Sequence, residues 1–195
     1  MSKSGRLIIL SGPSGVGKST IRDLVVARSP ITIHLSVSAT TRAPRLGERD
    51  GVDYFFLSND EFQNLRQQDQ FVECQEVFGR NIWYGTLRRE VEQHLSAGVW
   101  VLLEIDVDGA REVVKKYPDA ITIFIAPRSL EALEERLRSR GTESEEAMRH
   151  RLARAEYEIN QSAFYKYNVV NDVLETAVHD FCEIIRQEEF SGGTK

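Results

Sequence analysis

The stretch Gly12–Ser19 reads Gly-Pro-Ser-Gly-Val-Gly-Lys-Ser, and it constrains the fold of this chain more than any other feature. It fits the pattern Gly-x-x-x-x-Gly-Lys-Ser/Thr. Directly before it, Leu7–Leu10 is a short apolar run of the kind that forms a buried parallel strand. After it, Thr20–Arg28 carries apolar residues at helical spacing. Strand, glycine-rich loop and helix in this order predict a P-loop that binds a nucleoside triphosphate.

The residue types of the loop suit this chemistry. Its glycines let the backbone curl until successive N–H groups point inward at phosphate oxygens. Lys18 has the reach to contact the β- and γ-phosphates, and the Ser19 hydroxyl is the expected protein ligand of Mg²⁺. We therefore expect ATP to be bound by Gly12, Pro13, Ser14, Gly15, Val16, Gly17, Lys18, Ser19 and Thr20.

Length and charge limit the remaining possibilities. At 195 residues the chain is expected to form one domain, and its net charge of −5 makes a nucleic-acid partner a poor fit. No apolar stretch is long enough to cross a bilayer, so no membrane partner is expected. The two cysteines and four histidines match no metal or redox spacing. These features predict a cytoplasmic protein with reduced thiols.

Apolar runs alternate with helical patterns along much of the chain. Strands are expected at 99–105, 121–125 and 169–170. Five helices are expected: at 87–97, at 110–116, from Leu130 to a stop at Gly141, along a stretch striped by Met148, Leu152, Ala155 and Ile159, and at 173–188. A Thr142–Glu145 capping box is expected to open the fourth of these helices. Strands alternating with helices after a P-loop predict an α/β fold of three layers, with a central parallel sheet between helices.

The region from His34 to Thr86 breaks this alternation. It reads as short strands at 34–38, 53–57, 70–78 and 82–84, with one short helix capped at Ser58–Glu61. We expect a small mixed α/β insert here, a natural place for a second substrate.

Two arginines stand out at the start of this insert. Arg42 and Arg45 would face opposite sides of a straight strand, whereas a bend at Ala43-Pro44 would let both reach one anion. From charge alone, two solvated arginines remain the competing interpretation.

The surrounding residues then resemble a known family. Ser-x-Ser-x-Thr-Thr-Arg-x-Pro-Arg-x-Gly-Glu at 36–48, followed by Gly-x-Asp-Tyr-Phe-Phe at 51–56, resembles the GMP-binding segment of guanylate kinases. The resemblance covers essentially the whole chain and continues in order through Phe71-x-Glu73, Tyr84-Gly85-Thr86, Leu103–Asp106, Arg140–Glu143 and Val170–Asp172.

The resemblance implies a division of the chain and roles for its residues. A single domain at 1–195 would consist of a core (1–33, 87–135 and 160–195), a GMP-binding insert (34–86) and an arginine-rich helical lid (136–159). The implied GMP-binding residues are Ser38, Arg42, Arg45, Tyr54, Glu73, Tyr84, Thr86 and Asp106. The implied catalytic residues are Lys18, Arg42, Arg136, Arg140 and Arg151. Asn171 matches a residue near the adenine of ATP, although a plain turn asparagine is nearly as good an interpretation.

The chemistry of these residue types agrees with the implied roles. Two arginines and two tyrosines supply donors for the GMP phosphate. An ionised Glu73 accepts from guanine N1–H and N2–H, whereas adenine presents an unprotonated N1 that would leave the carboxylate unpaired. Ser38 and Thr86 are expected beside guanine O6. Glu104 and Asp106, two residues apart, share one face at the end of a strand, and the sequence does not apportion acceptor contacts and Mg²⁺ between them.

The lid arginines have a competing explanation. Pairing with glutamates at i,i+4 on a solvated helix would account for such a cluster. Arg136, Arg140 and Arg151 match the family's lid arginines, and Arg138, Arg149 and Arg154 are expected at the surface.

The chain also departs from the family in two places. The loop at 79–84 is about two residues longer than in relatives. Asp108 stands where relatives usually carry glutamine, and it is assigned no role.

These observations predict a guanylate kinase that converts ATP and GMP into ADP and GDP with Mg²⁺, in purine nucleotide metabolism. Deoxy-GMP is expected to serve as an acceptor; a homo-oligomer is compatible with the sequence, which does not fix the oligomeric state. Two other functions were weighed: a non-catalytic phosphopeptide-binding scaffold, which the intact Gly12–Ser19 loop disfavours, and a sister kinase acting on a ribose bisphosphate, which Glu73, Ser38 and Thr86 disfavour.

Overall fold

The structure of the chain is a computed structural model, and it describes residues 5–77, 81–139 and 144–192. The chain divides into two compact units. The first comprises residues 1–7, 34–103 and 108–120, and the second comprises residues 8–33, 104–107 and 121–195. We describe each unit by itself.

The second unit contains three neighbouring parallel strands in the order β1 (Leu7–Ser11), β8 (Ile121–Ala126) and β9 (Tyr167–Val170). Ile8 pairs with Ile121, and Ile123 pairs with Tyr167. All five residues of β1 and the first five of β8 are buried. Continuous burial of this kind explains why these strands read as unbroken apolar runs.

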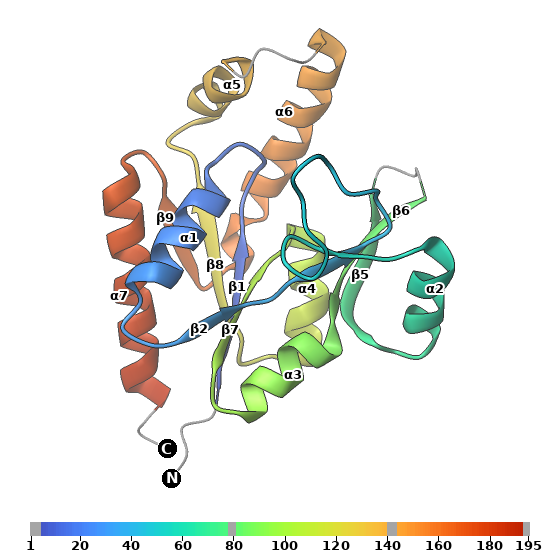
Figure 1. Cartoon of the computed structure of the whole chain (residues 1–195). Coiled ribbons are helices and arrows are strands. Elements are labelled where there is room, and N and C mark those ends of the chain that lie inside the picture. Colours follow the sequence, from blue (N-terminus) through green and yellow to red (C-terminus); the bar gives the residue numbers. More distant parts are fainter. Residues whose placement is uncertain (1–4, 78–80, 140–143, 193–195) are drawn as a thin grey trace. The chain divides into compact units, whose positions relative to one another are not determined.

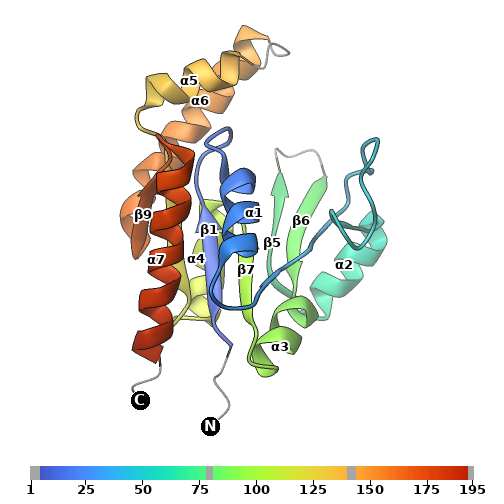
Figure 2. The ribbon, with the colours of Figure 1, turned by 60° about the vertical axis from the view of Figure 1, so that its left-hand side comes forward.

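Helices pack around this sheet. Helix α1 (Lys18–Arg28) begins directly at the P-loop and lies beside the long carboxyl-terminal helix α7 (Leu174–Gly192), as Figure 1 shows. Helices α5 (Leu130–Arg138) and α6 (Glu145–Asn160) form a second pair, and a 3₁₀ turn η1 (Ser162–Phe164) follows α6 (Figure 2). Ser144 caps α6 by accepting from the N–H of Ala147, so the helix begins later than the expected Thr142–Glu145 box. Thr142 itself lies outside the described residues.

The first unit contains a four-stranded sheet in the order β4 (Phe55–Phe56), β3 (Ser38–Thr40), β6 (Ile82–Leu87) and β5 (Phe71–Val77). Helix α2 (Asn59–Gln67) packs on β5 and is closed by the expected capping box between Ser58 and Glu61. The unit also holds β2 (Ile33–Leu35), β7 (Trp100–Glu104), α3 (Arg88–Ser96) and most of α4 (Val107–Lys116).

Two strand predictions in this unit are wrong. The run expected as one strand at 34–38 forms the end of β2 and the start of β3, because the chain changes its pairing partner at this point. The N–H of Ser36, just after β2, still donates to Leu102 O, whereas β3 pairs with β6. The strand expected at 53–57 shrinks to Phe55–Phe56, because Asp53 turns the chain by accepting from the N–H of Arg49.

One face of the four-stranded sheet packs against α2. Phe62 of α2 is fully buried and stacks on Phe71 at a ring-centroid distance of 4.4 Å. Ala39 and Leu87 complete the buried cluster. Burial of a side chain such as Phe62 stabilises the fold by roughly 1.5–3 kcal/mol. The opposite face of this sheet is therefore the one left for polar chemistry.

Candidate functional site

The described residues carry two constellations of polar side chains, one in each unit. We call the first the P-loop cavity and the second the polar face of the four-stranded sheet.

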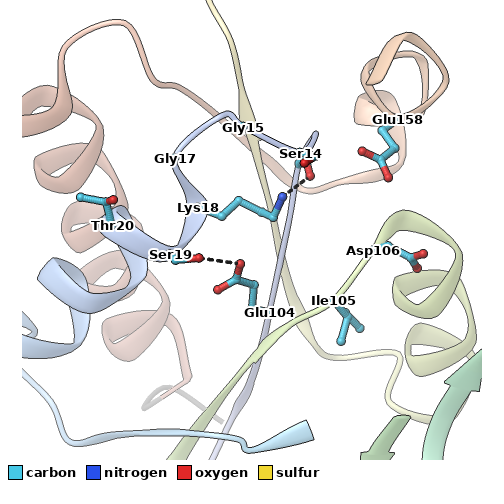
Figure 3. A pocket seen from close by; sticks show the side chains of 11 residues that line it. Ser14, Gly15, Gly17, Lys18, Ser19, Thr20, Glu104, Ile105, Asp106 and Glu158 are labelled. Carbon is cyan, nitrogen blue, oxygen red and sulfur yellow. Dashed lines mark hydrogen bonds between the residues drawn. The ribbon is translucent and has the colours of Figure 1, made fainter. Parts of the chain in front are cut away.

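The P-loop cavity lies in the second unit and has a volume of about 440 Å³. Figure 3 shows its lining: Gly12, Ser14, Gly15, Gly17, Lys18, Ser19, Thr20, Glu104, Ile105, Asp106 and Glu158. Of the residues that the sequence assigns to the ATP phosphates and Mg²⁺, all except Pro13 and Val16 line the P-loop cavity. Asn171, predicted near the adenine, does not line it.

The backbone of the loop depends on its glycines. Gly12 has φ +150°, and a Cβ there would lie 2.3 Å from the carbonyl oxygen of Ile125. Gly17 has φ +96° and stands at the N-cap of α1, where a Cβ would lie 2.7 Å from Nδ2 of Asn171. A left-handed turn packed this closely against its neighbours favours glycine. It also aims the first N–H groups of α1 and the positive end of its dipole into the cavity.

Lys18 lies across the loop that it follows. Its Nζ donates to the carbonyl oxygen of Gly12 and, at 3.0 Å, to that of Pro13. Burial lowers the pKa of Lys18, and the carboxylates of Glu104, Glu158 and Asp106 oppose that shift. The ammonium therefore sits among buried dipoles and acidic groups, where it is suited to hold an incoming phosphate.

Glu104 is the last residue of β7 and lines the cavity. Its Oε1 accepts from the Ser19 hydroxyl at 3.3 Å, and its Oε2 accepts from Arg22 at 2.7 Å. The N–H of Ile105 donates to Leu10 O at 3.2 Å, which ties this segment to β1. Asp106, two residues after Glu104, also lines the cavity, and their separate roles stay a prediction.

Three predicted lid or adenine residues have contacts with the loop itself. Arg151 donates to the hydroxyl of Ser14 at 2.9 Å. Asn171 is buried, and its Nδ2 donates to Val16 O at 2.7 Å, so its side chain stabilises the backbone of the loop. Arg136 donates to Val16 O at 3.5 Å and to Asn171 O at 3.0 Å. Arg140, the fourth lid or adenine residue predicted, lies outside the described residues.

The sequence did not indicate two further residues: Glu158, which lines the cavity, and Arg154, which bonds to two of its lining carboxylates. Arg154, expected at the surface, donates to Asp106 Oδ2 at 3.2 Å and to Glu158 Oε1 at 3.0 Å. Glu158 is buried, which raises its pKa against the opposing effect of Arg154 and Lys18. The i,i+4 spacing of Arg154 and Glu158 was visible in the sequence, but it is equally typical of a solvated pair.

The second constellation follows from strand register in the first unit. Ser38 pairs with Thr86, and Thr86 pairs with Glu73. Directly opposed residues of antiparallel strands point to the same face, so all three side chains lie on the polar face. Tyr84, two residues before Thr86, shares it. The sequence-predicted base-reading residues are thus brought together.

Glu73 is buried, with a residue exposure of 8%, and Thr86 donates to its Oε1 at 2.7 Å. Burial of a carboxylate costs free energy unless its oxygens accept hydrogen bonds. We therefore expect hydrogen-bond donors to meet the Glu73 carboxylate at this face.

Arg42 joins the tyrosines on this unit. Its Nε donates to the hydroxyl of Tyr84 at 3.1 Å, and its Cζ lies 5.4 Å from the ring centroid of Tyr54. The Tyr54 and Tyr84 rings meet edge to face at 5.8 Å. Arg42, Tyr54 and Tyr84 therefore form one cluster, as predicted.

Glu48 closes the bend between the two arginines, and sequence reasoning gave it no role. Its carboxylate accepts two bonds of 2.9 Å from Arg42 and one of 2.7 Å from the N–H of Arg45. These bonds raise the pKa of Arg42 and lower the pKa of Glu48. The side chain of Arg45 is exposed, so its backbone, rather than its guanidinium, shares an anion with Arg42.

Comparison with known proteins adds an independent observation. The sequence model of the guanylate kinase family matches residues 4–188. A protein of Rhodopirellula baltica named guanylate kinase is 49% identical over 93% of this chain and 87% of its own length. A guanylate kinase of Synechocystis sp. is 48% identical over 96% of this chain and 97% of its own.

A solved structure agrees with these sequences. The crystal structure of guanylate kinase from Anaplasma phagocytophilum is 34% identical to the chain and superposes with a TM-score of 0.77, covering 96% of this chain and 87% of that one. This similarity confirms the predicted α/β fold class.

Proposed function

The chain belongs to the guanylate kinase family, and from that membership we propose that it transfers the γ-phosphoryl group of ATP to GMP in nucleotide metabolism. The observation that carries the proposal is the joint presence of an intact P-loop cavity and a sheet face on which Glu73, Thr86 and Ser38 meet.

In this reaction an oxygen of the GMP phosphate attacks the γ-phosphorus of ATP in line. The bond to the bridging oxygen breaks, and ADP leaves with both electrons of that bond. The attacking phosphate is already anionic, so no general base is needed, and catalysis consists of positioning and charge stabilisation. We propose that Lys18 and the loop N–H groups hold the transferred group, with Arg151 and Arg136 supplying further positive charge, and Arg140 as well on the family pattern.

Magnesium fits the donor set of the cavity. The Ser19 hydroxyl and the carboxylates of Glu104 and Asp106 all line it. Hard oxygen donors suit Mg²⁺, which takes its remaining ligands from water and phosphate oxygens. No group of three acidic, histidine or cysteine side chains able to hold a metal by itself occurs among the described residues. We propose Ser19 as the direct protein ligand; the bound ion would neutralise charge on the β- and γ-phosphates.

The polar face supplies the specificity. We propose that Glu73 accepts from N1–H and N2–H of guanine while Thr86 and Ser38 lie beside O6, and that Arg42, Arg45, Tyr54 and Tyr84 bind the phosphate. A site built on a buried carboxylate rejects adenine, which would leave that charge unpaired. The contacts assigned to base and phosphate do not depend on the ribose 2′-hydroxyl, so we expect deoxy-GMP to be accepted.

The cellular setting is also a proposal. Cys74 and Cys182 are free thiols, which fits a reducing cytoplasm. Within the residues that the structure describes, no helix has both the length and the apolarity needed to cross a membrane. A homo-oligomer stays a prediction for analytical ultracentrifugation.

A coupled assay of ADP release tests the proposed function. With ATP and Mg²⁺, we expect fast turnover with GMP, slow turnover with AMP, and none with a ribose bisphosphate. ADP release that is independent of the acceptor, or fastest with the sugar bisphosphate, would contradict the proposal. A folded protein that turns over no acceptor would favour the non-catalytic scaffold.

A further inference from the structure

The P-loop cavity contains a buried carboxylate that the proposed reaction does not use. Glu158 of α6 reaches its lining, as Figure 3 shows, and its side chain is only 9% exposed. A buried carboxylate without a paired charge would strongly destabilise the fold. Its Oε1 accepts from Nε of Arg154 at 3.0 Å.

Arg154 is in turn fixed from three directions. Besides Glu158, it contacts Asp106, whose Oδ2 accepts from Nη2 at 3.2 Å. The Arg154 guanidinium also lies over the ring of Tyr157, with Cζ 5.0 Å from the centroid. A planar guanidinium with one donor on Nε and another on Nη2 can join two carboxylates in this way, and a lysine ammonium cannot copy that geometry.

We infer that Arg154 and Glu158 are positioning residues of the phosphoryl transfer: Arg154 fixes the carboxylate of Asp106 at the cavity, and Glu158 fixes Arg154. The inference rests on the proposed function, because Asp106 lines the cavity proposed to hold ATP and Mg²⁺, and the family resemblance implies that it contacts GMP. Neither residue is expected to contact the reacting atoms.

The ion pairs of Arg138, on helices α5 and α6, differ from the Arg154–Glu158 pair in their exposure to solvent. Arg138 pairs with Glu134 at i,i+4 and with Glu145, and these three side chains are between 38% and 76% exposed. Such solvated pairs contribute little. The Arg154–Glu158 pair has the same spacing, but one partner is buried and the other reaches a cavity-lining carboxylate.

A double-mutant cycle tests the positioning of Asp106. Arg154→Gln is compared with Asp106→Asn and with the double variant, and Arg149→Gln, which removes an exposed arginine from the same helix, is the matched control. We expect Arg154→Gln to lower kcat/KM for GMP phosphorylation roughly ten- to a hundredfold, the range known for outer-shell partners of functional groups. The double variant should be no slower than Asp106→Asn alone, because the arginine acts through that carboxylate. Arg154→Lys should not restore activity.

The Glu158→Gln variant tests whether Glu158 fixes Arg154. The amide keeps the volume and one acceptor oxygen, so the variant is expected to fold, as thermal unfolding will check. Combined with Arg154→Gln, it should be no slower than Arg154→Gln alone, because the glutamate acts through that arginine. Where Arg154→Gln fails to fold, Glu158→Gln and Arg154→Lys take over the test.

Several results would overturn the inference. They are an Arg154→Gln variant as active as Arg149→Gln, losses that multiply in either double variant, an Asp106→Asn variant as active as the wild type, or a Glu158→Gln variant as active as the wild type. These outcomes differ from failure of the proposed function, in which the wild-type protein itself would not phosphorylate GMP.

Discussion

At the scale of single residues, Glu73 has the most unusual environment for its type. A glutamate is rarely buried, yet only 8% of this one is exposed. The Thr86 hydroxyl donates to one of its oxygens at 2.7 Å, and the proposed guanine would supply two further donors. A base without those donors leaves buried charge unpaired, and discrimination then follows from desolvation rather than from shape.

Glu73→Gln should weaken selectivity for the base. The amide keeps the size of the side chain but replaces one acceptor with a donor that opposes guanine N1–H or N2–H. We expect kcat/KM for GMP to fall by roughly two orders of magnitude or more and the GMP/AMP ratio to narrow. Steady-state kinetics with both acceptors measure this, with the exposed Glu112→Gln as control. An unchanged ratio would mean that another group reads the base.

Lys18→Ala should abolish turnover and leave the fold intact. The fold should survive, because the hydrogen bonds described for Lys18 go to carbonyl oxygens of the loop. Activity should not survive, because loss of a charged donor at a transferring phosphate lowers the rate on the order of a hundredfold to a thousandfold. Steady-state kinetics and circular dichroism on the same sample provide the measurement. Full activity in a folded Lys18→Ala protein would refute the P-loop assignment.

The site residues show what a sequence reveals at this scale. The Gly12–Ser19 octet was predictable because every position has a distinct physical requirement. The roles of Glu48 and Arg154 were not predictable, because most charged residues on loops and helices are simply solvated. Only the structure shows that the Glu48 carboxylate closes the Arg42–Arg45 bend. It likewise shows that the Arg154 guanidinium bridges Asp106 and Glu158.

At the scale of elements, strand β5 explains how a polar face arises from an apolar segment. Phe71 pairs with Leu87, whereas Glu73 pairs with Thr86, so the register shifts between them. Two residues apart on a regular strand, Phe71 and Glu73 would share a face. The irregularity instead sends Phe71 to the α2 cluster and Glu73 to the polar face. The strand was predictable from its composition, but the irregularity was not, because no residue type signals it.

The capping box of α2 gives an element-scale prediction. Ser58 accepts from the N–H of Glu61 at 3.2 Å, and no catalytic role is assigned to either residue. Ser58→Ala should lower the free energy of unfolding by about 1 kcal/mol and leave GMP turnover unchanged. Urea denaturation measures the first effect and the coupled assay the second. An equal loss of activity would mean that α2 takes part in binding.

The same box predicts a pH dependence. Hydrogen bonds from Ser58 lower the pKa of Glu61 below its ordinary value of 4.5. A carboxylate whose pKa is depressed by folding stabilises the protein above the unfolded pKa, and this contribution disappears as pH falls through the folded pKa. Glu61→Gln should therefore be less stable than the wild type at neutral pH, and the difference in the free energy of unfolding should close as the pH falls through the lowered pKa of Glu61. A gap that is constant across this range would contradict the assignment.

At the scale of the whole molecule, each compact unit carries most of one set of the predicted residues; Asp106, implied to bind GMP, lies instead in the second unit with the ATP-binding set. The second unit holds the P-loop cavity, and the first holds the polar face with Arg42, Tyr54 and Tyr84. The α/β class was predictable because apolar runs and helical stripes repeat along the chain. The single-domain division into core, insert and lid stays a prediction, since segment boundaries depend on contacts between residues distant in sequence.

This arrangement predicts separable effects of the two nucleotides on stability. A ligand that binds only the folded state adds about 2.7 kcal/mol at a hundredfold excess over its Kd. Lys18→Ala should lose the rise in melting temperature caused by MgATP and keep that caused by GMP, and Glu73→Gln should do the reverse. Differential scanning fluorimetry measures both. Loss of both effects in either variant would contradict independent sites.

The most direct measurement is nucleotide stoichiometry. Purified protein is incubated with ATP, Mg²⁺ and GMP, and the four nucleotides are separated by ion-exchange chromatography, with Lys18→Ala as the blank. The account predicts that one GDP appears for each ADP and that ADP does not form without GMP. ADP accumulating without GDP, or no conversion by folded wild-type protein, would contradict it.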